Sequence, residues 1–234
     1  MENNSKIISC ILSRYNEDLS WTLEPPFNNF KYIVYNKGEN ENFHKENVVS
    51  VIKLENVGKD IHTYLHHIVH NYESLTDIVM FLPASMSASY KRDKALALIS
   101  STISTNFTNA YFLGQYSPNL KHYFFNYTQA NWVPSTKENQ YYTTNNYQLL
   151  PSTFRPYGKW FAYHFKDNIV NWWSYNNTFS IDKRDIWKYP KSYYEEFLNE
   201  VSMANDTEVA HYIERSWNAI FGPFQYTKIL EYKM

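Results

Sequence analysis

Short apolar runs, each followed at once by polar or turn-forming residues, are the feature of this sequence that most limits its fold. Residues 6–12 (KIISCIL), 30–35 (FKYIVY) and 77–82 (DIVMFL) are rich in β-branched and aromatic residues and show no helical period. The first run is followed by SRYNED, the second by NKG and the third by Pro83. The pattern predicts buried strands that end in loops.

The order of the elements predicts a wound α/β fold. Residues 48–54 form another short β-like run, and a helix with one apolar stripe is expected over 60–72. A second helix is expected over 91–105. We therefore expect a mixed, mostly parallel sheet flanked by helices, with any ligand lying beyond the carboxyl ends of the strands.

The second half of the chain is less regular. A Tyr- and Asn-rich stretch at about 116–156 has weak periodicity and is expected to be an irregular insertion. Beyond it, 177–186 is expected to be a strand leading into a helix, and 192–201 and 209–221 are expected to be helices. The length of 234 residues fits a single domain over 1–234.

Composition excludes some partners. The formal net charge is -1, with 22 basic and 23 acidic residues mixed along the chain, which gives no footprint for nucleic acid. Cys10 is the only cysteine, so no internal disulfide can form. No stretch is apolar enough to span a membrane and the N-terminus is polar, so we expect an intracellular, cytoplasmic protein.

The cluster after the first run carries many hydrogen-bonding groups. Arg14 could bind a diphosphate, Glu17 or Asp18 could bind base or ribose hydroxyls, and Tyr15 and Asn16 add further polar groups. Alternatively, Asn16 to Asp18 simply cap a short helix. Asn36 and Lys37, after the second run, are expected at the same edge of the sheet.

A second cluster lies at the start of the helix expected over 60–72. Asn56 and Gly58 would allow a tight turn whose free N–H groups favour an anion, and Lys59 would add positive charge. His62 and His66 are spaced for one helical face, which could line the site or place two imidazoles on a metal. The sequence marks out no further metal ligands, and ordinary packing remains an alternative.

A third cluster lies near the C-terminus. Glu214 and Arg215 precede Trp217 in an expected helix, so that Glu214 could act as a general base towards a sugar acceptor. A solvated or paired helix face would explain the same residues.

Together these segments resemble a known family. RYNEDLSW, VYNKG, NVGKDIHTYLHHIVHNYESLTDIVMFL, PKSYYEEF and IERSWNAIFG occur in the order found in domain of unknown function 3431, a family of fungi and large DNA viruses. The resemblance runs from about Ile7 to Gly222. That family is in turn similar to GT-A glycosyltransferases, which implies a nucleotide-sugar donor and a glycan or other hydroxyl acceptor.

One departure from GT-A enzymes bears on the chemistry. Those enzymes commonly carry Asp-x-Asp after the strand at the donor site, to hold Mg²⁺ or Mn²⁺ on the diphosphate, whereas Pro83–Ser87 contains no carboxylate. If the enzyme is metal-independent, the diphosphate is held by Arg14, Lys37, Lys59 or helix N-terminal amides. The alternatives are that Mn²⁺ or Mg²⁺ binds together with the nucleotide-sugar donor, or that donor chemistry has been lost. Where the family tends to have Arg-Glu, this chain has Lys59-Asp60, and Asp60 is included among the binding residues.

The leading hypothesis is a glycosyltransferase with Glu214 or Asp18 as its base. The first alternative is a carbohydrate- or nucleotide-binding domain without catalysis. The second is a metal-dependent hydrolase that uses His62 and His66.

Overall fold

The main sheet brings the predicted strands together. The structure, a computed structural model, describes residues 5–129 and 149–232. In it, the strand order is β3-β2-β1-β4-β7. These strands are β1 (Ile8–Arg14), β2 (Tyr32–Asn36), β3 (Val48–Lys53), β4 (Ile78–Pro83) and β7 (Phe179–Asp182). The first four run parallel, and β7 runs antiparallel to β4. The expected mixed, mostly parallel sheet is confirmed.

A smaller sheet was not predicted from the sequence. It has the order β6-β5-β8, with β6 (Trp172–Trp173), β5 (Ala110–Tyr116) and β8 (Thr227–Glu231). β5 pairs in parallel with β8, more than a hundred residues further along the chain. Pairing over such a separation depends on the tertiary fold, and a local sequence pattern does not reveal it.

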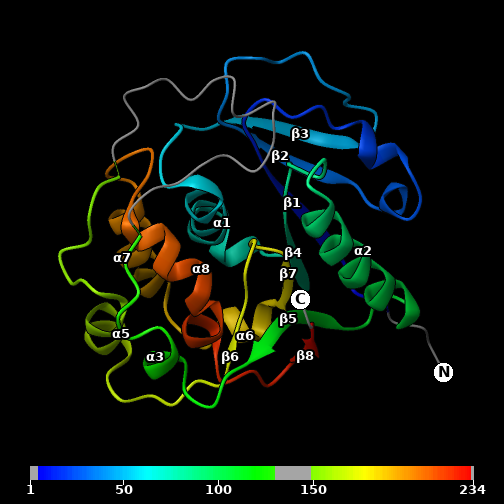
Figure 1. The fold of residues 1–234 in the computed structure, drawn as a ribbon. Coiled ribbons are helices and arrows are strands. Elements are labelled where there is room, and N and C mark those ends of the chain that lie inside the picture. Colours follow the sequence, from blue (N-terminus) through cyan, green and yellow to red (C-terminus); the bar gives the residue numbers. More distant parts are fainter. Residues whose placement is uncertain (1–4, 130–148, 233–234) are drawn as a thin grey trace.

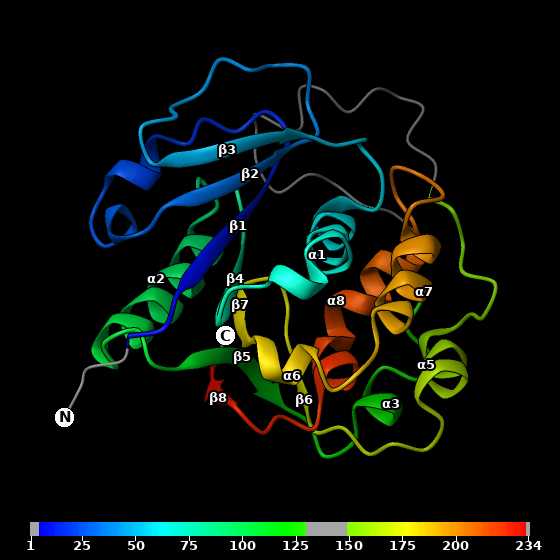
Figure 2. The same cartoon turned by 180° about the vertical axis from the view of Figure 1, so that it is seen from behind.

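Helices cover both faces of the main sheet (Figures 1 and 2). One face is covered by α1 (Lys59–His70), α7 (Lys191–Val201) and α8 (Glu208–Phe221), with α3 (Leu120–Tyr123) and α5 (Tyr157–Phe165) beyond them. The other is covered by α2 (Ser89–Ser104). The short elements are α6 (Lys183–Ile186) and the 3-10 helices η1 (Ser20–Leu23), η2 (Phe27–Asn29) and η3 (Tyr72–Ser74). The result is a single α/β domain.

The two faces of the sheet have separate cores. Ile11 of β1 packs in the core that contains Tyr64 of α1, whereas its neighbours Cys10 and Leu12 pack in the core that contains Leu98 of α2. This alternation is the period of a strand buried on both sides. Packing on both faces fixes the position of the end of β1, and therefore the position of the polar residues that follow it.

The predicted helices agree with the structure to within about two residues at each end. The stretch at about 116–156, expected to be an irregular insertion, contains the short helix α3 and ends at Pro156, the N-cap of α5, and its residues 130–148 lie outside the described ranges. α5 itself was not predicted.

Candidate functional site

The carboxyl ends of β1 and β2 are joined by Arg14. Its side chain is 1% exposed, and Nη1 donates to Oδ1 of Asn36 at 2.7 Å and to the carbonyl oxygen of Asn40 at 2.6 Å. Nε donates to the carbonyl oxygen of Glu17 at 2.7 Å. Arg14 therefore holds loops together with most of its donors. Nη2 has no hydrogen-bond partner among the residues that the structure describes.

The Tyr15–Asp18 segment is a turn closed by Glu17. The buried Glu17 carboxylate accepts from the backbone N–H of Tyr15 at 2.7 Å and of Asn16 at 3.1 Å. The predicted alternative, in which Asn16 to Asp18 cap a helix, is wrong for η1, since Leu19 is its N-cap and makes no side-chain capping bond. Asp18 instead pairs with His44 at the surface, with 2.6 Å between Oδ1 and Nδ1.

Lys37 is buried behind the turn that precedes α1. Its ammonium donates to the carbonyl oxygens of Val57 and Lys59. Burial lowers the pKa of Lys37 to about 7, although the charge of Asp60, in the first turn of α1, opposes this shift. The two carbonyl bonds give Lys37 a structural role that the sequence did not reveal.

The turn itself has the predicted tight geometry. Gly58 has φ 55° and Lys59 has φ 53°, both in the left-handed region. A Cβ on Gly58 would lie 2.4 Å from the carbonyl oxygen of Val201, so only glycine fits between α1 and α7. Asn56 lies half-buried in the same turn.

Lys59 points its ammonium to a buried acid. The distance to Oδ1 of Asp206 is 3.2 Å, and Nε2 of His211 lies 3.0 Å from the same oxygen. Burial lowers the pKa of Lys59 to about 8, with the charge of Asp206 opposing the change. The lysine expected to bind an anion is therefore already paired, and stands at the start of α1.

Burial favours the neutral form of His62 and His66 on α1. His62 and His66 lie on one face, with ring centroids 5.8 Å apart, as the spacing predicted. Burial, reinforced by Lys37, lowers the pKa of His62 to about 3, and burial with His70 lowers that of His66 to about 4. Within residues 5–129 and 149–232, no group of three His, Cys, Asp or Glu side chains is arranged to hold a metal.

Glu214 stands at the centre of a second set of polar residues. It lies on α8, and its Oε1 accepts from the backbone N–H of Asn176 at 2.8 Å. Its Oε2 lies 3.4 Å from Nη1 of Arg215. Asn176 belongs to the loop between β6 and β7. Because Phe179 at the start of β7 pairs with Phe81 near the end of β4, this loop lies at the carboxyl edge of the sheet.

Lys94 reaches the same loop from α2, on the other face of the sheet. It is 5% exposed, and its ammonium donates to the carbonyl oxygen of Tyr175 at 2.8 Å and to Oδ1 of Asn176 at 3.2 Å. Burial lowers the pKa of Lys94 to about 8, whereas the charge of Glu214 raises it. A partly desolvated lysine thus faces the loop that Glu214 holds.

Arg215 is the last member of this set of polar residues, and its guanidinium lies among three aromatic rings. Its guanidinium carbon lies 4.1 Å from the ring centroid of Tyr127, 5.3 Å from that of Tyr175 and 5.5 Å from that of Phe124. Its Nη1 also donates to the carbonyl oxygen of His211, and its buried Nε has no hydrogen-bond partner in the described part of the chain. Because the rings fix the plane of the guanidinium, the positive charge and the remaining N–H donors of Arg215 can face a ligand from only a limited range of directions.

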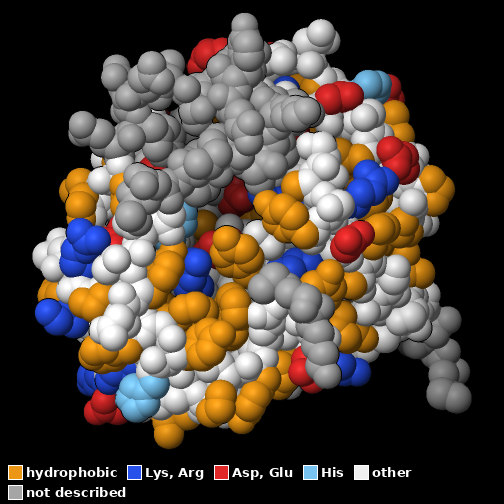
Figure 3. Space-filling model, viewed as in Figure 1, with side chains coloured by type: hydrophobic (Ala, Val, Ile, Leu, Met, Phe, Trp, Pro, Cys, Tyr) orange, Lys and Arg blue, Asp and Glu red, His pale blue; other side chains and the backbone are white. Residues whose placement is uncertain are grey.

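We refer to Lys59, Lys94, Tyr175, Asn176, Glu214 and Arg215 as the Glu214 centre. Asn176 links Lys94 to Glu214, because its Oδ1 accepts from Lys94 and its backbone N–H donates to Glu214. The charge of Glu214 also raises the pKa of Lys59. Figure 3, which is viewed from the same side as Figure 1, shows acidic and basic side chains around a hollow near the middle of the molecule. Such an arrangement can bind an anionic ligand and can accept a proton beside it.

Sequence reasoning missed Lys94 and the 175–177 loop. Lys94 precedes Leu98 by four residues, on the apolar stripe of α2, and a lysine on a buried stripe was an available signal. The Asn176-Asn177 pair also carried a signal, because both residues have positive φ, which asparagine tolerates better than most residues.

The fold and the site define a class: a mixed α/β protein with a charged site beyond the carboxyl ends of its parallel strands. The family model described as Protein of unknown function (DUF3431) matches residues 10–229. The chain belongs to this family. A search of curated proteins found no match. No helix in the described ranges is long and apolar enough to cross a membrane.

Proposed function

We propose that the protein is a glycosyltransferase that binds a nucleotide-sugar donor at the Glu214 centre. The observation that carries the proposal is that Arg215 directly, and Lys94 through Asn176, are joined to the Glu214 carboxylate at the carboxyl edge of the sheet. Ligands of wound α/β folds bind at this edge. The resemblance to GT-A enzymes that we expect from the sequence motifs points to the same donor class.

In this proposal the cations replace a metal. Pro83–Ser87, after β4, offers no carboxylate for a divalent ion, and Oγ of Ser85 accepts from Nζ of Lys91 at 2.8 Å. The residues present therefore do not fit a metal on the diphosphate at this position. Lys94 and Arg215 would instead stabilise the negative charge that develops on the leaving diphosphate.

Glu214 has the role of general base. It takes the proton of the acceptor hydroxyl as that oxygen bonds to the anomeric carbon, and the bond from that carbon to the diphosphate oxygen breaks. The products are the glycosylated acceptor, the nucleoside diphosphate and protonated Glu214. The bond from the Asn176 N–H holds Oε1 in place, while Glu214 keeps further lone pairs for the proton.

The test is a thermal-shift panel of nucleoside diphosphates and their sugar conjugates, with and without Mn²⁺. A donor at ~100 times its Kd should stabilise the fold by about 2.7 kcal/mol. Lys94→Met should reduce the shift, whereas Lys159→Met on the exposed side of α5 should not. The transferase proposal requires release of nucleoside diphosphate when donor and acceptor are combined.

Two other outcomes would replace the proposal. Binding without any release, across a broad set of acceptors, would identify a non-catalytic nucleotide- or carbohydrate-binding domain. Stabilisation by transition metals alone would favour the hydrolase hypothesis. That hypothesis needs a third metal ligand beside His62 and His66, and the described residues provide none.

A further inference from the structure

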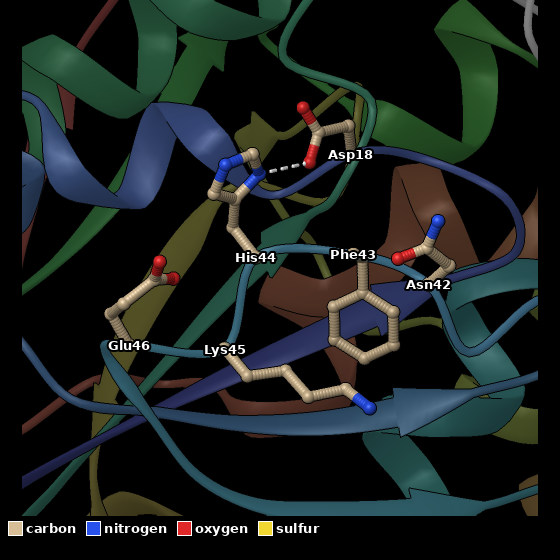
Figure 4. Close-up of a pocket in the computed structure, with 6 residues that line it drawn as sticks. All are labelled: Asp18, Asn42, Phe43, His44, Lys45 and Glu46. Carbon is tan, nitrogen blue, oxygen red and sulfur yellow. Dashed lines mark hydrogen bonds and ion pairs between the residues drawn. The ribbon is translucent and has the colours of Figure 1, made fainter.

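A separate pocket lies over the loop between β2 and β3. It has a volume of about 580 Å³ and is lined by Asp18, Asn42, Phe43, His44, Lys45 and Glu46. Figure 4 shows Asp18 entering from the loop after β1, opposite His44. The volume falls within the range of roughly 300–1,000 Å³ that is typical of small-molecule sites. The function proposed for the Glu214 centre makes no use of this pocket beyond the earlier hypothesis that Asp18 is a base.

The walls of the pocket are held in place by the buried Arg14 and by a surface contact of Asp18. The guanidinium of Arg14 lies 4.0 Å from the ring centroid of Phe43, and Nη1 of Arg14 also bonds the carbonyl oxygen of Asn40 at 2.6 Å. The loop carrying the pocket is thus joined to the end of β1. On the opposite side, the 2.6 Å contact between Asp18 and His44 joins the two loops. The pocket is therefore built on contacts within the fold.

The lining chemistry selects a class of ligand. The negative charges of Asp18 and Glu46 are balanced by the positive charge of Lys45 and by His44. The hydrogen bond to Asp18 raises the pKa of His44. A strongly anionic ligand would meet the two carboxylates, and a strongly cationic one would meet Lys45. A neutral ligand avoids both costs.

The polar groups favour hydroxyls over a flat ring system. Five of the six lining side chains are polar, and they include donors, acceptors and an amide that is both. A nucleobase would need two apolar surfaces for its faces, whereas Phe43 provides one aromatic ring. A pyranose has hydroxyls around its edge and an apolar C–H face that can pack on one aromatic ring.

We propose that the pocket formed by Asp18, Phe43 and His44 binds a neutral saccharide. Phe43, whose ring centroid lies 4.0 Å from the Arg14 guanidinium and 4.8 Å from the Lys45 ammonium, supplies the apolar contact through its remaining ring surface. Asp18, Asn42 and Glu46 accept hydrogen bonds from sugar hydroxyls. This site is distinct from the Glu214 centre and does not depend on transferase activity.

The test uses saturation-transfer NMR and calorimetry on the full chain without nucleotide. The probes are maltotriose, cellotriose, mannotriose, chitotriose and galactobiose, with uridine and guanosine as competitors. We expect at least one saccharide to bind, and we expect Phe43→Ala and Asp18→Asn each to weaken it at least tenfold. Asp167→Asn and His122→Ala, at exposed positions outside the pocket, should leave the affinity unchanged.

Asp18→Asn guards against a misfolded Phe43 variant, because Asp18 is mostly exposed. Binding of none of the saccharides would overturn the proposal, as would binding that both variants leave intact. Displacement of the saccharide signal by a nucleoside, with tighter nucleoside binding, would also overturn it in favour of a nucleobase site. Since no nucleotide sugar is present, failure here leaves the thermal-shift test of the Glu214 centre unaffected.

Discussion

The backbone N–H of Asn176 donates a 2.8 Å hydrogen bond to Oε1 of Glu214, joining the loop before β7 to the middle of α8. Glu214→Gln keeps a side-chain oxygen that can accept this bond but removes the basic carboxylate. We expect the variant to fold normally and to lose transfer activity by roughly 10²–10⁴-fold, the usual contribution of a general base.

The measurement is the turnover rate with the donor found in the thermal-shift panel, together with the melting temperature. Glu195→Gln on α7, whose side chain is about half exposed, is the matched control. Turnover of the Glu214 variant within twofold of the unaltered protein would remove Glu214 from the role of base.

Asn177 is strained in a way that a pair of variants can reveal. It has φ 51°, its Oδ1 accepts from Nε1 of Trp217, and its carbonyl oxygen accepts from the Tyr64 hydroxyl. Asn177→Ala and Asn177→Gly both remove the acceptor for Trp217, but only alanine also meets the steric cost of positive φ. We expect alanine to be less stable than glycine by about 1 kcal/mol in urea unfolding.

At the control position, the expected difference in stability between the alanine and glycine variants has the opposite sign. Asn199 lies on the exposed side of α7, where alanine should be more stable than glycine by about 1 kcal/mol because of helix propensity. The same order at both positions would contradict the strain assigned to Asn177.

The sequence predicted those parts of the fold that have strong local patterns. The strands of the parallel sheet have β-branched runs, and α1 and α8 have clear amphipathic periods, so their positions followed from short stretches of residues. β5 and β8 pair across more than a hundred residues, and the local pattern of neither one shows which strand it pairs with. Their formation depends on contacts that a local analysis does not contain.

The candidate site could be predicted only as separate groups of residues. Glu214 and Lys59 were both identified, but the sequence could not show that Lys94 of α2 reaches Asn176, which also bonds Glu214. Conversely, Arg14 and Lys37 were expected to face a ligand, and instead donate mainly to protein oxygens. A basic residue at a strand end can serve either purpose, and only its burial and partners distinguish them.

Gly58 should be intolerant of substitution. A Cβ there would lie 2.4 Å from the carbonyl oxygen of Val201, and its φ of 55° disfavours other residues. We expect Gly58→Ala to lower the free energy of unfolding by roughly 1–3 kcal/mol or more, and the melting temperature by several degrees. The measurement is calorimetric or urea unfolding, and an unchanged midpoint would contradict the close contact between α1 and α7.

Lys37 should make the stability depend on pH above neutrality. Burial lowers its pKa to about 7 from an ordinary 10.5, so between these values the unfolded chain binds more protons than the folded one. Stability should therefore rise with pH over this range. Lys37→Met removes this contribution. Urea unfolding at steps from pH 7 to 9.5 should show the unaltered protein gaining about 1–3 kcal/mol relative to the variant.

The slope of that difference with pH carries the test, because it is separate from the constant cost of removing the bonds that Lys37 makes to Val57 and Lys59. Tyrosines, whose ordinary pKa is about 10, ionise in the unaltered protein and in the variant alike, so their contribution cancels in the difference. Lys159→Met, at an exposed lysine, should give a flat difference. A flat difference for Lys37→Met as well would mean that the Lys37 ammonium stays charged across the range, and that the two carbonyl oxygens offset its burial.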